Sequence, residues 1–504
     1  MALNENALAK ANSKYLRQHA GHPVWWQEWS PGVLKAASQQ KKLLFVSVGY
    51  SSSHGCHVMA NKTFTDPVVA KLLNGNFISI KVDREQRPDI DQYLMDFMVA
   101  TTGNAGWPLN VFLSPDLKPF LAFSYAPAED SETEKGLLSI IPQALSYFRR
   151  NSNNLSHFSI SKNGPPHAAE YETDPIKAIL EDFDEANGGF GTGSKYPPHS
   201  TLLFLIYRYC CSPSKEAAHV IQTTLDAMAC RGLHDHIHGG FFRYCKDNEW
   251  QLPYFEKLLI DQAMHLWVFS LAEKIFPGNG YRFVAIGVLR CLERDFRVGE
   301  CYGSAIDADV DNVEGGGTLW SVQDLTASIS HEQRKLLHSI FSFVDAQPTH
   351  KENSQENDSR YHIIRSCHLL HNPAGINHLL EQIRNFRAKH VRPQLDSTIL
   401  TDANSLTGIA LIVASRCLNR PGLLQRAHEL FFALNHTMDR HGQFSHSQLN
   451  FSGSKQFFAR DAAALTLFAD ILYEHSFDMK KHYEHSWQIL QGFNTTNSNW
   501  LEST

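Results

Sequence analysis

The first 150 residues alternate between short apolar runs and amphipathic segments, a pattern that predicts a mixed α/β domain over 1–150. Apolar runs of strand type lie at 43–48, 77–82, 109–113 and 120–125. Apolar residues at helical spacing predict helices over 35–42, from about 53 onward, over 89–102 and over 131–150. An aromatic-rich arm at 1–30 precedes the first strand, and it is expected to pack over a core. The resulting order is β-α-β-α-β-β.

The stretch 45–59 joins the first strand to the next helix. Its apolar run breaks at Gly49 into a serine-rich turn, and Ser53 is a preferred residue for the N-cap of a helix. A strand, a turn and a helix start is where the thioredoxin fold holds its paired thiols, the first of them at the positive end of the helix. Here the first position is Ser53, and only the second, Cys56, is a cysteine. Pro108, just before the third strand, takes the position of the proline that is cis in that fold.

A single thiol limits the redox chemistry of this motif. Disulfide exchange in a two-thiol cycle needs an attacking and a resolving thiol, and Ser53 cannot be either one. We therefore expect no ordinary dithiol reductase activity. Two interpretations of Cys56 stay open, namely a reactive thiol that forms mixed disulfides and a redox-silent structural remnant. A zinc site at His54, Cys56 and His57 is disfavoured because three ligands in one turn are too crowded, and we predict no metal and no cofactor.

Beyond a polar segment at 151–171, interpreted as a linker, long helical patterns alternate with short segments rich in glycine and aromatic residues. The predicted helices cover about 174–186, 198–211, 214–232, 253–275, 279–297, 372–389, 403–418, 421–439, 458–475 and 478–490. A helix pair followed by a Gly-x-Phe hairpin recurs, and this internal repeat predicts an all-α toroid of α/α hairpins over 172–504. The polar segment 345–359 is interpreted as a disordered surface loop.

Composition fits two globular domains. The 504 residues are 43% hydrophobic with a formal net charge of -6, which gives no indication of nucleic-acid or membrane binding. None of the nine cysteines forms a Cys-x-x-Cys pair. A cytoplasmic location is expected, because neither a disulfide framework, a signal peptide nor a membrane span is visible.

Several motifs resemble one known family. They include Gly49-Tyr50-Ser51, Cys56-His57-Val58-Met59, Val82-Asp83-Arg84-Glu85, Gly106-Trp107-Pro108-Leu109, Gly188-Gly189-Phe190-Gly191, Asp235-His236, Phe255-Glu256-Lys257-Leu258 and Ala305-Ile306-Asp307-Ala308-Asp309. With them the chain, from about Asn6 to about Asp470, resembles the YyaL-type, spermatogenesis-associated thioredoxin-like proteins. The resemblance implies an α/β thioredoxin-like domain followed by an all-α barrel of the six-hairpin glycosidase or N-acylglucosamine 2-epimerase type.

The chain departs from the family pattern in several places. Ser53 replaces the first cysteine of the motif, and Tyr254 stands where the family usually has histidine. The run 396–405 differs from the family's Asp-Asp-Lys-Ile-Leu-Thr-Ser-Trp-Asn-Gly. The chain also stops soon after Leu490, where family members continue with further helices, so a toroid shortened at its C-terminal end is expected.

Charged residues of the barrel motifs are the candidate catalytic groups, namely Glu256, Lys257, Asp307, Asp309 and His236. Glycosidases need two carboxylates, and Glu256 with Asp307 or Asp309 is a candidate pair, with Glu256 near the barrel mouth if a helix opens at 254–259. Epimerase-type barrels abstract a proton with histidine, for which His236 is the candidate. The other interpretation of these residues is a buried salt-bridge network. The resemblance adds substrate-binding candidates, namely Trp107, Lys195, Asp235 and Asp261.

Three functions stay open at this point. The first is a barrel that binds or processes a sugar-like small molecule, with the thioredoxin-like domain as a lid or docking module. The second is a single-thiol protein that forms mixed disulfides through Cys56. The third is a non-catalytic protein derived from an enzyme, which binds a protein partner through the thioredoxin-like domain. The alternate histidines His234, His236 and His238 also suggest a metal, but a polar loop at the barrel mouth is the favoured interpretation.

Overall fold

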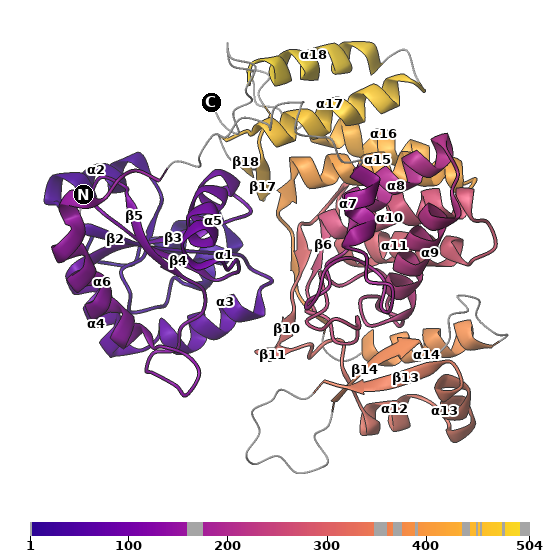
Figure 1. Ribbon diagram of the computed structural model, residues 1–504, viewed down its shortest axis with the longest axis horizontal. Helices are drawn as coiled ribbons and strands as arrows, with labels where there is room; N and C mark the ends of the chain where they lie inside the picture. The colour runs from indigo at the N-terminus through magenta and orange to yellow at the C-terminus, as the bar shows by residue number, and fades with distance from the viewer. Residues whose placement is uncertain are drawn as a thin grey trace. The chain divides into compact units, whose positions relative to one another are not determined.

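A computed structural model of the chain describes residues 3–158, 175–346, 360–365, 375–388, 392–435, 444–449, 452–453, 456–475 and 479–493 (Figure 1). The chain divides into two compact units, the first mainly residues 1–167 and the second mainly 168–448 and 455–502. Most of the predicted linker 151–171 and of the predicted surface loop 345–359 lies outside the described residues. Within the described residues, no helix has both the length and the apolar character needed to cross a membrane.

The first unit is built on a five-stranded sheet in the order β1-β3-β2-β4-β5. Its strands are β1 (Gln27–Glu28), β2 (Leu43–Gly49), β3 (Phe77–Asp83), β4 (Leu109–Leu113) and β5 (Pro119–Phe123). Strand β3 is parallel to β1 and β2, whereas β4 is antiparallel to β2 and β5. Every residue of β2 and β3 is buried, which explains their nearly continuous apolar sequences.

Helices cover both faces of this sheet. On one face α2 (Pro31–Gln40) and α5 (Pro88–Thr102) bury Val33 and Leu94 against the strands. On the other face lie α1 (Lys14–Gln18), α4 (Pro67–Asn76) and α6 (Leu137–Asn151), with Tyr15, Val69 and Ile141 in a shared cluster. Short helices complete the unit, namely α3 (His54–Val58), η1 (Leu8–Lys10), η2 (Met59–Thr63) and η3 (Ser152–Asn154). This is the thioredoxin-like arrangement predicted from the order of the apolar runs.

The second unit consists mainly of helical hairpins. After α7 (Pro175–Glu181), they are α8 (His199–Cys211) with α9 (Lys215–Cys230), α10 (Leu259–Ile275) with α11 (Tyr281–Cys291), α15 (Thr401–Cys417) with α16 (Gly422–Asn435), and α17 (Ala459–Tyr473) with α18 (Lys480–Gln491). The first helices of the pairs pack on one another, since α10 contacts both α8 and α15, and α15 contacts α17. The recurring helix pairs of the sequence therefore form a helical toroid arrangement.

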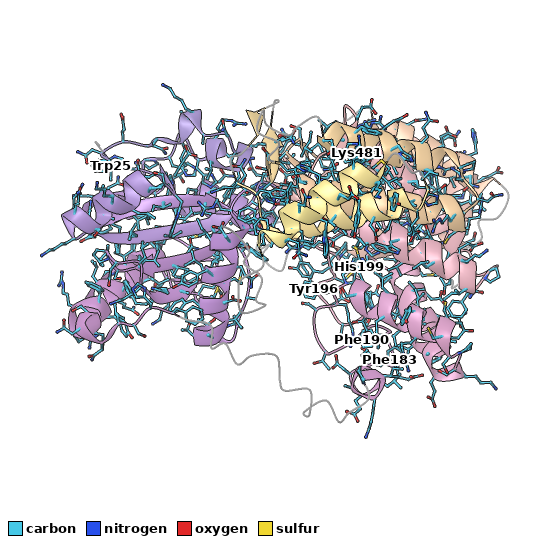
Figure 2. All side chains as sticks on the ribbon, turned by 90° about the horizontal axis from the view of Figure 1, so that it is seen from above. Trp25, Phe183, Phe190, Tyr196, His199 and Lys481 are labelled. Carbon is cyan, nitrogen blue, oxygen red and sulfur yellow. The ribbon has the colours of Figure 1, made fainter. Side chains whose placement is uncertain are left out.

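Turns with paired glycines connect parts of these hairpins. Gly188, Gly189, Gly239 and Gly240 all have positive φ between 75° and 79°, a conformation that glycine adopts without strain. A Cβ on Gly189 would also lie 2.8 Å from the ring of buried Trp250. Phe190, next to this turn, packs on Phe183 with 6.0 Å between ring centroids (Figure 2).

A long insertion separates α11 from α15. It contains β13 (Phe341–Asp345), β14 (Arg360–Arg365) and β12 (Trp320–Ser321) in one sheet, packed with α12 (Val322–Ser328), α13 (His331–His338) and α14 (Ile376–Ala388) around a separate apolar cluster. The remaining short elements are β6 (Lys257–Leu258), η5 (Leu292–Phe296), β7 (Arg297–Val298), β8 (Cys301–Tyr302), β9 (Ala305–Ile306), β10 (Asp309–Val310), β11 (Val313–Glu314), β15 (Leu395–Asp396), β16 (Ile399–Leu400), β17 (Ser447–Leu449) and β18 (Ser452–Gly453). The sequence did not predict the β12-β14-β13 sheet.

Candidate functional site

The thioredoxin-type motif adopts the geometry predicted for it. Ser53 is the N-cap of α3, and its hydroxyl accepts a hydrogen bond from the Cys56 amide at 3.4 Å. The peptide bond before Pro108 is cis. A Cβ on Gly55 would lie 3.3 Å from the carbonyl oxygen of Trp107 and 3.4 Å from Cδ of Pro108, so this turn packs directly on the cis proline.

The surroundings of Cys56 do not activate its thiol. Cys56 is 2% exposed, and burial raises its pKa, although the Ser53 hydroxyl and the Lys81 ammonium partly offset that effect. Lys81 is itself buried, which lowers its pKa to about 7, and its Nζ bonds Oγ of Ser47 at 2.9 Å. Reactive cysteines combine a lowered pKa with partial exposure, and Cys56 has neither property.

We therefore expect Cys56 to stay unmodified when the folded protein is incubated with glutathione disulfide. The exposed Cys210 and Cys211 provide an internal positive control in the same sample. Peptide mass spectrometry after alkylation measures each site separately. A glutathionylated Cys56 at the extent seen for Cys210 would support the mixed-disulfide hypothesis instead.

Trp107 lies beside this motif in the first unit, and its ring is held by neighbouring side chains. Its Nε1 donates to Oδ1 of Asp91 at 2.7 Å, and the Arg84 guanidinium carbon stands 4.1 Å from the centroid of its ring. Such cation–π stacking holds the ring of Trp107, which is the residue directly before the cis proline Pro108. The structure gives Trp107 a positioning role in the turn, and its predicted role in substrate binding stays a prediction.

A cavity of about 980 Å³ lies in the second unit. Its wall is formed by the loop His234–His238, by parts of α11 and η5, and by α14 of the insertion. Of the predicted catalytic and substrate-binding residues, Asp235, His236 and Lys257 line this cavity, together with the alternate histidines His234 and His238. The sequence placed them near a barrel mouth, and the structure brings them together.

Asp235 and Lys257 form a buried ion pair in the cavity wall. Nζ of Lys257 lies 2.7 Å from Oδ2 of Asp235 and donates to the carbonyl of Gly239 at 2.9 Å. Burial alone would raise the pKa of Asp235, but Lys257 and His238 hold it well below its usual value. Burial likewise opposes the charge on Lys257, yet Asp235 raises its pKa. Both groups are therefore charged across the physiological pH range.

Two neutral histidines lie next to this pair. Burial and neighbouring His234 lower the pKa of His236 far below its usual value. Its Nε2 lies 3.0 Å from the carbonyl of Cys230, an arrangement that places the proton on Nε2 and leaves a lone pair on Nδ1. Burial lowers the pKa of His234 to about 4. Its Nδ1 bonds the carbonyl of Ala229 at 3.0 Å, and its buried Nε2 has no hydrogen-bond partner.

The acidic residues expected to form a carboxylate pair do not line the cavity. Glu256 is fully buried, with Oε1 2.7 Å from Nη1 of Arg243. Asp309 is buried in β10, and its amide bonds Oδ1 of Asp307 at 3.0 Å. The expected helix at 254–259 is wrong, because the chain is extended through β6 and the helix begins at Leu259. The alternative interpretation, a salt-bridge network, describes Glu256 better.

Lys195 and Asp261 also lie away from the cavity wall. Nζ of Lys195 is fully buried, 2.9 Å from Asp184 and 2.7 Å from the carbonyl of Gly191, so it joins the two sides of the glycine turn that precedes α8. Asp261 lies in the first turn of α10, where a carboxylate interacts favourably with the helix dipole. Their predicted roles in substrate binding stay predictions.

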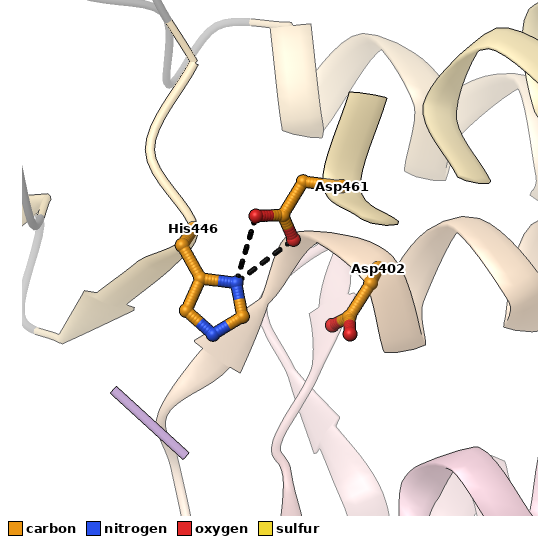
Figure 3. A group of neighbouring side chains, drawn as sticks. All are labelled: Asp402, His446 and Asp461. Atoms are coloured by element: carbon orange, nitrogen blue, oxygen red, sulfur yellow. Dashed lines mark hydrogen bonds and ion pairs between the residues drawn. The ribbon is translucent and has the colours of Figure 1, made fainter. Parts of the chain in front are cut away.

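One further group of side chains has spacing compatible with metal ligation within the described residues (Figure 3). The ligand atoms of Asp402, His446 and Asp461 lie within 4.8 Å of one another. Nδ1 of His446 already bonds both carboxylate oxygens of Asp461, at 2.8 and 2.9 Å, and Arg460 lies 3.3 Å from Asp402. Burial lowers the pKa of His446, but Asp461 raises it more. We interpret the group as an ion-pair network between the starts of α15 and α17.

Comparison with known proteins follows the same division into two parts. Residues 5–162 match the thioredoxin-like DsbH family model, described as a protein of unknown function, DUF255. A rat protein named spermatogenesis-associated protein 20 is 32% identical over 472 residues, covering 84% of this chain and 60% of the rat protein. An uncharacterized protein of Caenorhabditis elegans is 29% identical over 486 residues, covering 88% of this chain and 66% of its own length. The chain thus spans two thirds or less of these relatives.

Among solved structures, a sugar epimerase from a ruminal bacterium aligns with 65% of this chain and 87% of its own, with 13% identity and a TM-score of 0.33. The fold defines a two-part class of protein in which a thioredoxin-like domain precedes a helical toroid. Within that class, residues 5–162 match the DsbH-type thioredoxin-like domain, and 84% of the chain is similar to spermatogenesis-associated protein 20.

Sequence reasoning missed several cavity residues. The missed cations are all arginines. They are Arg290 in α11, Arg294 in η5, Arg384 and Arg387 in α14, and Arg392 after α14. No motif marks them, because they come from segments about a hundred residues apart. The alternating histidines of 234–238 were one available signal, and their favoured interpretation, a polar loop at the barrel mouth, did not single out the unpartnered Nε2 of His234.

Proposed function

We propose that the helical unit binds a sugar-like small molecule in the cavity beside the His234–His238 loop. The observation that supports it most is the combination of a cavity of about 980 Å³ with a buried, unpartnered acceptor in its wall, Nε2 of His234. Buried polar atoms without a partner are rare in proteins and are costly unless a ligand or water satisfies them. A sugar hydroxyl is a donor suited to this atom.

The rest of the wall supplies the mixed character that sugar sites need. Ligand sites combine apolar walls with a few fixed polar groups. Phe255 and Phe283 provide aromatic surface, while Asp235 and Lys257 hold each other in place and give the loop a rigid base. A rigid wall lowers the entropic cost of binding.

In this proposal the first unit is not a dithiol reductase. Ser53 supplies no thiol, and the buried Cys56 has a raised pKa. A docking role for this unit toward a protein partner stays a prediction, as does any turnover of the bound sugar.

A ligand-observed NMR screen tests the proposal. Saturation transfer from the full chain to a panel of neutral and acidic mono- and disaccharides is expected to give hits that displace one another, as a single site requires. The variant Lys177→Gln provides the matched control, because Lys177 is 72% exposed on α7 and does not line the cavity. It is expected to retain every hit. A panel without any saturation transfer would remove the proposal.

A further inference from the structure

The cavity wall carries an excess of positive charge. Its cationic side chains are Lys257, Arg290, Arg294, Arg384, Arg387 and Arg392, against the carboxylates Asp235, Glu293, Asp295 and Glu381. The chain as a whole has a net charge of -6. The cations therefore gather here against the overall balance of the protein.

Half of these cations already have strong partners. Lys257 pairs with Asp235, and Arg294 pairs with Asp295. Arg387 donates to the carbonyl of Leu319, and its guanidinium stacks on Trp320 at 4.1 Å. These groups build the wall and are not available to a ligand.

Arg290, Arg384 and Arg392 make fewer bonds within the protein than the first three cations. Within the described residues, Arg290 and Arg392 have no hydrogen bond or ion pair, and both are exposed at the cavity rim. Arg384 is half-buried, and the single interaction found for it in the same residues is a donation to the carbonyl of Ile237 at 3.0 Å. No carboxylate bonds Arg290, Arg384 or Arg392 directly among the described residues, although the charges of Glu381 and Asp235 act on Arg384 from a distance.

Two of these arginines stand close enough to repel each other. Burial lowers the pKa of Arg384, and the nearby charges of Arg294 and Arg290 lower it further. Two guanidinium groups that line the same cavity can together bind carboxylate or phosphate oxygens.

The acceptor on His234 lies in the same loop that Arg384 contacts. Arg384 bonds the carbonyl of Ile237, three residues after His234, and Arg294 bonds the carbonyl of His238 at 2.7 Å. His234 is 6% exposed, and its Nε2 lies 3.9 Å from the point where a Cβ on Gly287 would stand, with Gly287 also in the wall. The cavity wall thus holds a buried hydrogen-bond acceptor without a partner beside arginines that have few partners.

We infer that the cavity selects an anionic sugar, one that carries a carboxylate or a phosphate. Arg290 and Arg384 bind the anionic group, and Nε2 of His234 accepts a hydrogen bond from a hydroxyl of the same molecule. This inference rests on the proposed function and names the substrate class of that site.

Dissociation constants of three probes test it, measured by NMR titration on the full chain with D-glucuronate, D-glucose 6-phosphate and D-glucose. At least one anionic probe is expected to bind tenfold or more tightly than D-glucose. The anionic probe with the lower dissociation constant shows whether the site prefers a carboxylate or a phosphate. Raising the salt concentration should weaken the binding of the anionic probe and leave the binding of D-glucose unchanged, because salt screens charge interactions at exposed sites.

Charge-removing variants locate the anion site. Arg290→Gln and Arg384→Gln are each expected to reduce the affinity for the anionic probe about fivefold to tenfold without changing that for D-glucose. Arg282→Gln is the matched control, because Arg282 is an exposed residue of the same helix α11 outside the cavity wall. Arg290 has no structural bond to lose among the described residues, so its variant keeps the test valid if Arg384→Gln is unstable.

The outcomes separate the two claims. Equal affinities for D-glucose and both anionic probes, or an anion preference that survives both arginine variants, would overturn the inference and leave the proposed function standing. Binding of no sugar at all would overturn both.

Discussion

Replacement of Lys257 by methionine is expected to lower the free energy of unfolding of the second unit by about 3–5 kcal/mol, because it leaves the Asp235 carboxylate buried without its partner. Asp235 is 4% exposed and Lys257 is 5% exposed, so solvent compensates little for the lost ammonium. Denaturant unfolding followed by circular dichroism measures the change. A loss below about 1 kcal/mol, the range of exposed ion pairs, would contradict the assignment.

Two controls isolate the buried charge from lost packing. The double variant Asp235→Asn with Lys257→Met removes both charges and is expected to recover part of the loss, since no unpaired ion is left. Lys480→Met removes a 57% exposed lysine from the pair with Glu484 and is expected to change stability by less than about 1 kcal/mol.

The pKa shifts of Asp235 and Lys257 set the pH range over which their ion pair stabilises the folded protein. Asp235 has a lowered pKa in the folded protein, so its contribution is present above its usual value of 3.8 and is lost as the pH falls through the lower folded value. Lys257 has a raised pKa, so its contribution is present below 10.5 and is lost as the pH rises through the higher folded value. Stability from the pair should therefore be constant between these limits.

Substitution of Gly408 by alanine is expected to destabilise the toroid by about 1–3 kcal/mol or more, through overpacking. A Cβ at this position of α15 would stand 2.0 Å from Cζ of Phe468 on α17, and the Phe468 ring is fully buried. The ring cannot move without shifting the contact between these two central helices.

Gly287→Ala is the matched comparison in α11. A Cβ there meets only Nε2 of His234, at 3.9 Å, which is an ordinary contact distance. Alanine in a helix is favoured over glycine by roughly 0.5–1 kcal/mol. Thermal unfolding should therefore show a higher midpoint for Gly287→Ala and a lower one for Gly408→Ala. The same sign for both would contradict the packing described for one of the helices.

The fold of the first unit could be predicted because its central strands β2, β3 and β4 are buried throughout and appear as nearly uninterrupted apolar runs. β1 was missed, since two residues inside an aromatic arm show no alternation. The helical hairpins followed from their periodicity and from the repeated glycine turns. The β12-β14-β13 sheet was not predicted, because its strands come from segments separated by a polar stretch.

The candidate site could be predicted only in part, for a reason of local geometry. Side chains of neighbouring residues in extended chain point to opposite sides, so Lys257 reaches the cavity while adjacent Glu256 faces Arg243. Both were predicted to be catalytic as charged residues of a barrel motif, and an expected helix at 254–259 placed them together near the barrel mouth. The arginines of the cavity come from α11, η5, α14 and the chain at Arg392, and their meeting depends on the insertion fold, which the sequence did not predict.

The affinity of one variant tests the central claim most directly, namely that the cavity beside His234 is the ligand site. The tightest sugar found for the wild type is titrated into Gly287→Ala, whose added methyl group stands 3.9 Å from the unpartnered Nε2 of His234. We expect at least tenfold weaker binding together with an unchanged or higher thermal midpoint. Equal affinity in the wild type and in this stable variant would contradict the claim.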